Sequence, residues 1–213
     1  PTFRFFSLID LTPSLLSFVF HFKLPNFSSM TKRLLLLFAC AAVLNAQAQK
    51  INASKAAAIK DLDGRTSELT TISDKIWAAE EIAFQETVSA DLLADYAEAN
   101  GFTVERGVAG IPTAFIATYG SGSPVIGILG EFDALPGLSQ NTVPYKSPLH
   151  DGKPGHGCGH NLFGTASLGA AIAVKDLMAQ GKLKGTIKFF GTPAEEKFFG
   201  KIWMAKAGLF DDL

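Results

Sequence analysis

Residues 162–178 restrict the fold most strongly, because they are small and apolar on nearly every face. A helix without a polar stripe has no side to turn toward water, so other elements must cover it. Gly181 ends the segment, and an apolar strand pattern follows at residues 186–190. We therefore predict a buried helix packed closely on a β-sheet.

The residues before this segment predict helices followed by strands. Residues 51–99 carry apolar side chains at three- and four-residue steps, which indicates helices with a break at Asp63-Gly64. Residues 102–106 alternate as a short strand. Residues 113–119 and 125–130 are apolar strands joined by a turn rich in glycine and serine, which predicts an antiparallel hairpin.

A second helix is expected at residues 199–207, after the strand at 186–190. The order strand, loop, buried helix, strand, loop and helix is typical of α/β proteins, and we predict a three-layer α/β/α sandwich. The polar segment from residue 131 to residue 160 is long for a loop in a compact domain. Loops of this length are usually functional or disordered.

The first 48 residues differ from this pattern and predict export. Residues 30–48 combine Lys32-Arg33, an apolar run and the small-x-small cleavage site Ala46-Gln47-Ala48, as a secretory signal does. The apolar run is too short for a comfortable membrane span, so we expect cleavage rather than a retained anchor. The mature protein is expected to begin near Gln49 in the periplasm or outside the cell.

Two further expectations concern this end of the chain. Residues 1–29 precede Met30 and are crowded with phenylalanine in no regular period, so we expect a non-native or disordered leader. Cys40 offers an alternative to cleavage near Gln49, because Leu37-Phe38-Ala39-Cys40 resembles a lipoprotein attachment site.

Charge and cysteine content exclude two kinds of function. The formal net charge is −1 and no basic patch is present, so nothing in the sequence indicates a nucleic-acid partner. Once a signal is removed, Cys158 is the only remaining cysteine, which excludes an intramolecular disulfide. A single thiol within Gly-His-Gly-Cys-Gly-His is better explained by metal binding.

Two loop motifs carry the predicted chemistry. The segment 155–161 places the Cys158 thiol two residues before the His160 imidazole, and the segment 192–196 ends in the adjacent carboxylates Glu195 and Glu196. Alone, the first motif could be a tight loop and the second a solvated helix start. Together they offer thiolate, imidazole and carboxylate ligands for an ion such as zinc, and a second carboxylate to move protons.

With Glu-Phe-Asp-Ala-Leu-Pro at residues 131–136 ahead of these motifs, the chain resembles the aminoacylase and carboxypeptidase-type co-catalytic metallopeptidases. Within them it looks closest to the p-aminobenzoyl-glutamate hydrolase B-subunit group of amidohydrolases. The likeness runs over residues 51–213. It implies hydrolysis of amide bonds in N-acyl amino acids, dipeptides or p-aminobenzoyl-glutamate-like substrates, with one or two zinc or manganese ions.

The resemblance also implies roles for single residues. Cys158, His160 and Glu196 would bind metal, and Glu195 would be the general base. Asp133 would support the metal-binding histidine or bind metal itself, and His156 would either bind metal or orient its loop. Glu131 stands where carboxypeptidase-type relatives have a ligand histidine, and Asn161 where many relatives have aspartate.

The family carries later histidine ligands and an inserted lid or dimerisation domain, whereas no histidine follows His160 here. We therefore expect residues 49–213 to be the N-terminal part of a catalytic domain, inactive alone, from a protein that forms a homodimer and has no membrane span. Two alternatives remain: a catalytically incomplete metal- or ligand-binding domain, and a loop held by structural zinc. An unbonded second glutamate argues against the structural zinc.

Overall fold

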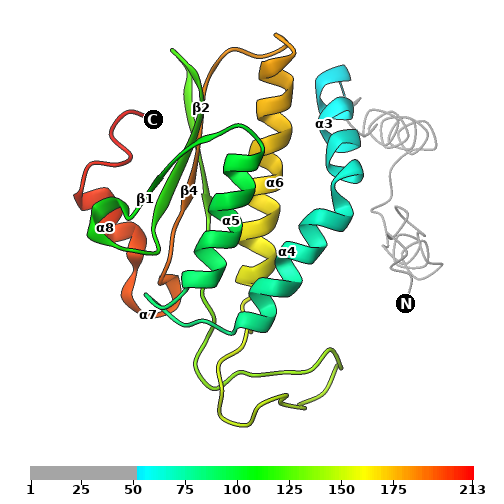
Figure 1. Ribbon diagram of the computed structural model, residues 1–213, viewed down its shortest axis with the longest axis vertical. Coiled ribbons are helices and arrows are strands. Elements are labelled where there is room, and N and C mark those ends of the chain that lie inside the picture. Colours follow the sequence, from blue (N-terminus) through cyan, green and yellow to red (C-terminus); the bar gives the residue numbers. More distant parts are fainter. Residues whose placement is uncertain (1–51) are drawn as a thin grey trace, which may run out of the picture. The chain divides into compact units, whose positions relative to one another are not determined.

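The computed structural model describes residues 52–213 (Figure 1). The predictions of a leader at residues 1–29, a signal at 30–48 and lipid attachment at Cys40 lie outside the described residues. Three helices open the described chain, and they bear out the helical pattern and its break at Gly64. They are α3 (Ala53–Gly64), α4 (Thr66–Ala79) and α5 (Thr87–Ala99).

Four strands and three further helices follow, together with the short turn η1 (Val108–Gly110). The strands are β1 (Thr103–Arg106), β2 (Phe115–Ser121), β3 (Val125–Gly130) and β4 (Gly185–Gly191). The long segment at 162–178 lies within α6 (His160–Ala179), as expected. The chain ends in α7 (Glu195–Phe198) and α8 (Gly200–Lys206).

The strands form one mixed sheet in the order β1-β2-β4-β3. β2 runs antiparallel to β1 and β4, whereas β3 runs parallel to β4. The predicted hairpin between residues 113–119 and 125–130 is therefore wrong, because β4 lies between these two strands. The turn after β2 does reverse the chain direction, but β2 and β3 are separated by the width of one strand. This strand is β4, which follows α6 in the sequence.

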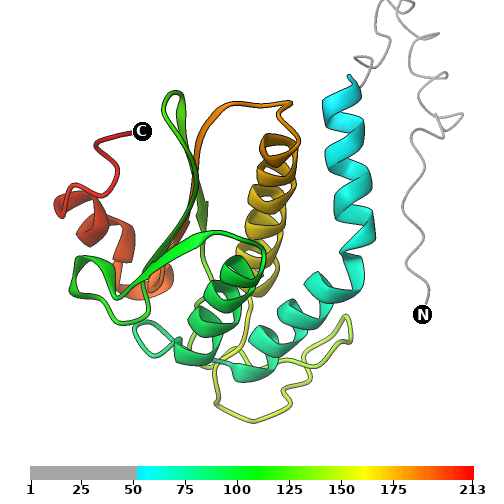
Figure 2. The same cartoon turned by 45° about the horizontal axis from the view of Figure 1, so that its top comes forward.

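Helices cover both faces of the sheet, which confirms the three-layer α/β/α sandwich (Figures 1 and 2). On one face, alternate residues of β2 and β4, such as Phe115 and Phe189, pack with α4, α5 and α6 in the main core. On the other, Ile116 and Phe190 pack with Met204 of α8. This second layer is thin, because a helix of 7 residues covers it.

α6 is the central helix of the main core. By length and composition it is the single helix of residues 52–213 that could cross a membrane. It packs against β3 and β4 and against α3, α4 and α5, so we assign it to the core of the domain. Leu168, Ala171 and Ile172 of this helix are fully buried.

The site lies where two parallel strands end. Gly130 of β3 pairs with Gly191 of β4, so the loops that follow these strands leave the sheet at the same edge. Both positions require glycine: a Cβ at Gly130 would lie 2.6 Å from the Phe189 ring, and one at Gly191 would lie 2.1 Å from the Phe115 ring. Thr192 joins the two ends, since its backbone N–H and its hydroxyl both donate to the Gly130 carbonyl, at 2.9 and 3.1 Å.

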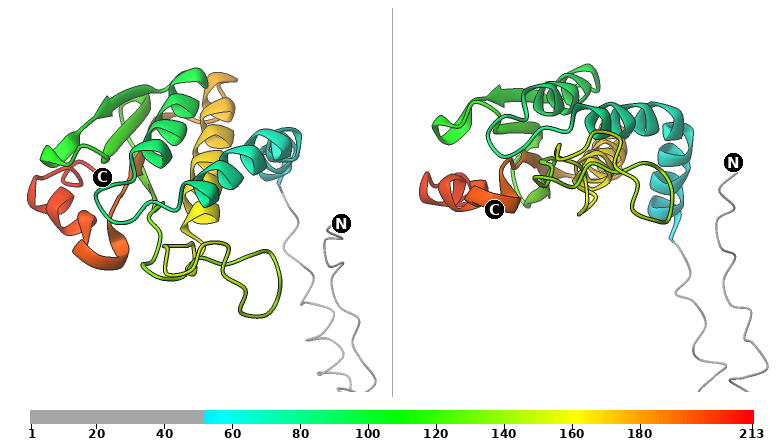
Figure 3. Two further views of the ribbon diagram at one scale, coloured as in Figure 1. Left: turned by 60° about the horizontal axis from the view of Figure 1, so that its bottom comes forward. Right: turned by 90° about the horizontal axis from the view of Figure 1, so that it is seen from below.

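The loop from residue 131 to residue 159 forms no helix or strand, as its composition predicts. It lies below the sheet in Figure 1, and Figure 3 shows it from that end. Leu135 and Gly155 exchange two backbone hydrogen bonds of 3.0 Å, which close the loop and return the chain to the start of α6. The two predicted motifs thereby reach the same edge of the sheet.

Candidate metal centre

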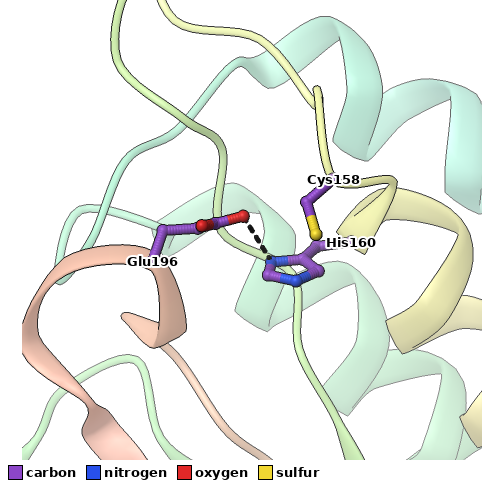
Figure 4. A group of neighbouring side chains, drawn as sticks. All are labelled: Cys158, His160 and Glu196. Atoms are coloured by element: carbon purple, nitrogen blue, oxygen red, sulfur yellow. Dashed lines mark ion pairs between the residues drawn. The ribbon is translucent and has the colours of Figure 1, made fainter.

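Cys158, His160 and Glu196 converge on one point, as the sequence predicts (Figure 4). Each offers one ligand atom, and these atoms lie within 4.8 Å of one another. In an extended loop, residues two apart face the same way. Here Gly159 has a left-handed conformation and His160 begins α6, so a turn rather than an extended segment brings the Cys158 and His160 side chains together. Glu196 reaches them from the first turn of α7.

Asp133 fixes the orientation of the His160 ring. Its Oδ1 lies 3.0 Å from His160 Nδ1, and its Oδ2 accepts the Glu196 backbone N–H at 2.9 Å. Burial raises the pKa of this carboxyl, but the hydrogen bonds from His160 and Glu196 outweigh burial and lower the pKa below its ordinary value. An ionised Asp133 accepts the proton of Nδ1, so a metal at Nε2 would replace the proton that this nitrogen shares with the Glu131 carboxylate, 3.0 Å away.

Both oxygens of Asp133 are thus occupied by the two predicted ligands. Of the two roles that the sequence left open for Asp133, this geometry favours support of the metal-binding histidine. Asp133 is 1% exposed, so water does not compete for these bonds.

A second group of three possible ligands shares the same ring. Glu131 Oε2 lies 3.0 Å from His160 Nε2, and Glu195 Oε2 lies 3.9 Å from the same nitrogen. Glu131 also forms an ion pair with Lys201 of α8. From the sequence, Glu131 stood out only as a departure from its relatives. Its position directly after a buried strand was the signal that could have placed it in the site.

The two adjacent glutamates approach different sides of the imidazole. Glu196 Oε1 is 3.8 Å from Nδ1, whereas Glu195 Oε2 is nearest to Nε2. The Glu196 side chain is 15% exposed and the Glu195 side chain 35%. One glutamate is therefore buried against the ligands, and the other faces the open side of the site.

The turn that carries these glutamates has a strained backbone. Ala194, which precedes Glu195, is fully buried and has φ 60° and ψ 35°, in the left-handed region. This conformation costs an L-residue about 1–2 kcal/mol, so contacts from the surrounding structure must hold it.

The negative charge of the carboxylates around His160 and Cys158 favours a bound cation. Burial and the Glu196 carboxylate raise the pKa of the Cys158 thiol. Burial lowers the pKa of His160, but Asp133 and the neighbouring glutamates raise it above its ordinary value. Glu196 Oε1 is buried without a hydrogen-bond partner. A divalent ion would displace the protons and supply the missing partner, so these residues fit a metal.

Comparison with known proteins agrees with this geometry. Residues 127–213 match the sequence model of peptidase family M20/M25/M40. By this match, residues 127–213 form part of a domain of this peptidase family. It is 50% identical over 145 residues to the B subunit of p-aminobenzoyl-glutamate hydrolase from Escherichia coli, an alignment that covers 68% of this chain and 30% of that protein. It is 31% identical over 180 residues to the Xaa-Arg dipeptidase of Mus musculus, with 78% and 38% covered.

A solved member of the family has the same fold. The YXEP protein of Bacillus subtilis, described as a dinuclear metal binding peptidase, superposes with a TM-score of 0.61 at 27% identity. The superposition covers 71% of this chain and 41% of that one. The chain spans about a third of the length of the curated relatives that it matches.

His156 belongs to neither group of possible ligands among the described residues. Its Nε2 lies 3.1 Å from the carbonyl oxygen of Ile76 and donates to it, and burial lowers the pKa of the ring. This bond ties the loop to α4. Of the two roles left open for His156, the geometry favours that of orienting the loop.

Proposed function

We propose that the protein is a metal-dependent amidohydrolase or peptidase whose centre is built by Cys158, His160 and Glu196. One observation carries the proposal: adjacent glutamates of one turn reach opposite nitrogens of a single buried imidazole, and Asp133 fixes that imidazole's tautomer. The match of residues 127–213 to the peptidase family and the names of the hydrolase and dipeptidase relatives support it.

In this proposal the chain's own residues divide the work. The His160 imidazole, the Cys158 thiolate and the Glu196 carboxylate would hold the ion; the thiolate and imidazole suit zinc, and the carboxylate also suits manganese. The bound ion would lower the pKa of a bound water to about 7 and polarise the amide carbonyl. Glu195, on the open side, takes a proton from the attacking water and gives it to the departing amine nitrogen.

The described residues complete one metal site rather than two. Both groups of possible ligands contain His160, and Asp133 already occupies its Nδ1. The two groups therefore share a single imidazole, and residues 52–213 supply no other imidazole to either group. This count supports the second candidate function, a metal- or ligand-binding domain without catalysis, for the described part of the chain.

We propose small-molecule amides as substrates, namely N-acyl amino acids, dipeptides or p-aminobenzoyl-glutamate-like compounds. The first class follows the resemblance, and the other two follow the names of the Mus musculus and Escherichia coli relatives. A homodimer, also implied by the resemblance, is checked by light scattering of the purified protein.

The test uses the complete gene product, stripped of metal by a chelator and reloaded with Zn²⁺ or Mn²⁺. We expect hydrolysis of at least one of the three substrate classes, its loss on chelation and its return with metal. A matched pair of variants, His160→Ala and His150→Ala, separates the site from the loop, since the His150 side chain is exposed and pairs with Glu80 rather than with a candidate ligand. Full activity without metal would refute the metal mechanism, and metal binding without hydrolysis would favour the second candidate.

A further inference from the structure

Glu86 is a buried carboxylate that the mechanism above does not use. It precedes α5, is 0% exposed, and takes part in none of the ion pairs of residues 52–213. Its Oε2 accepts the Thr113 hydroxyl at 3.1 Å, and its Oε1 accepts the Ala194 backbone N–H at 2.8 Å. A buried carboxylate without a cation is costly, so its partners are informative.

The bond to Ala194 is the important one. Ala194 is the left-handed residue directly before Glu195, and its side chain has no polar group with which to fix its own backbone. The chain on its N-terminal side is held by Thr192, whose two bonds to Gly130 fix the end of β4. Glu86 holds the next N–H in the chain, because Pro193 has none.

The segment that carries Glu86 also touches the other metal-site loop. We call residues 80–86, between α4 and α5, the α4–α5 link; it passes close to α7 in Figures 1 and 2. The Glu81 carbonyl accepts the Ala134 N–H at 2.8 Å, next to Asp133. Phe84, also left-handed, stacks on Phe198 of α7 with ring centroids 5.4 Å apart. The link thus contacts both loops beside their functional carboxylates.

We propose that Glu86 is a positioning residue that sets the Glu195–Glu196 turn by holding the Ala194 N–H. The proposal rests on the proposed function, because it gives this turn its purpose. Among residues 52–213, the Glu86 side chain forms hydrogen bonds with Thr113 and Ala194 and none with Cys158, His160, Glu195 or Glu196. It acts by restricting the turn to the conformation in which Glu195 and Glu196 reach opposite sides of His160.

The test compares Glu86→Gln with Glu86→Leu in the complete gene product. Glutamine keeps an oxygen for Ala194 and can donate to the Thr113 hydroxyl, so it should retain kcat and Zn²⁺ affinity. Leucine fills the space but accepts no bond, so kcat should fall on the order of tenfold or more with a smaller change in KM. Zn²⁺ affinity, measured by chelator competition, should fall about 10–100-fold, as for other residues that orient ligands.

Two further measurements separate positioning from general destabilisation. Ile172→Ala removes a fully buried side chain of α6 and serves as the matched control: it should lower thermal stability but leave Zn²⁺ affinity unchanged. In the Glu86→Leu background, Ala194→Gly should restore part of the lost affinity, because glycine adopts the left-handed conformation without help. A purely structural role for Glu86 would not predict this rescue.

The Trp203 indole gives a readout that needs no catalysis. Its N–H donates to the Phe198 carbonyl at the end of α7, at 3.2 Å, so its NMR resonance should shift in Glu86→Leu but not in Ile172→Ala. If the wild type binds Zn²⁺ without hydrolysing any substrate, the proposed function fails while affinity and resonance still test Glu86. If kcat, Zn²⁺ affinity and the Trp203 resonance of Glu86→Leu all equal those of the wild type, the positioning role is refuted. If that variant does not fold, Glu86→Asp, whose shorter side chain cannot reach both partners, is judged by the same criteria.

Discussion

Replacing Glu86 by glutamine should make the protein's stability less sensitive to pH. Burial raises the pKa of Glu86 from 4.5 to about 7, although the hydrogen bonds from backbone N–H groups and from Thr113 oppose this rise. Between these two values the folded protein keeps a proton that the unfolded chain releases. The unfolded state then binds fewer protons, so the free energy of unfolding falls as pH rises through this window.

The magnitude follows from the two pKa values. A rise from 4.5 to about 7 corresponds to roughly 3 kcal/mol of stability, present below pH 4.5 and lost by about pH 8. Glutamine carries no titratable proton, so this loss should be absent from the variant. Relative to the wild type, Glu86→Gln should gain about 3 kcal/mol as the pH is raised from 4.5 to 8.

Urea denaturation of both proteins, at constant ionic strength and with chelator present throughout, measures this difference at each pH. The comparison cancels the titration of His160, Asp133 and His156, which both proteins share. A difference that stays constant from pH 4.5 to 8 would show that Glu86 has no raised pKa in the folded protein, and would refute the reasoning from burial.

Three other predictions concern the site and the N-terminus. Glu195→Gln should leave metal content nearly intact and lower kcat on the order of 10² or more, because it removes proton transfer without removing a ligand; metal analysis beside kinetics checks this, and loss of metal would mean that the two glutamates have exchanged roles. Asp133→Asn should weaken Zn²⁺ binding about 10–100-fold, since an amide no longer fixes the Nδ1–H tautomer of His160; chelator competition measures it, and unchanged affinity would remove Asp133 from the site. N-terminal sequencing of exported protein should start near Gln49; a lipid-bearing start at Cys40 would place the protein at a membrane, and a cytoplasmic protein starting at or before Met30 would contradict export.

Local sequence pattern was enough to predict most of the elements and the approach of the two motifs to each other. The apolar run at residues 162–178 and the strand before Gly191 placed the two motifs at ends of the same sheet, and the structure brings Cys158, His160 and Glu196 together there. These predictions succeeded because periodicity and turn residues act over a few positions.

The errors arose where distant segments decide the outcome. The turn after β2 has the composition of a hairpin, yet β4 enters between β2 and β3 from some 60 positions later in the chain, and no local signal reports it. Glu131 and Glu86 are single carboxylates without a ligand spacing, so only the folded chain shows that one lies 3.0 Å from His160 and the other holds Ala194.

The glycines at the ends of β3 and β4 have a consequence for the evolution and engineering of this protein. The rings of Phe189 and Phe115 occupy the space that side chains at Gly130 and Gly191 would need. Packing in the main core therefore limits which residues can stand at the strand ends that carry the site. Alanine at Gly130 or Gly191 requires that Phe189 or Phe115, respectively, first be replaced by a smaller residue. Such substitutions must therefore occur in pairs, with the phenylalanine replaced before the glycine. A mutational library that varies only the loops can therefore change the side chains of the site, but it leaves the packing of Phe115 and Phe189 beneath them unchanged.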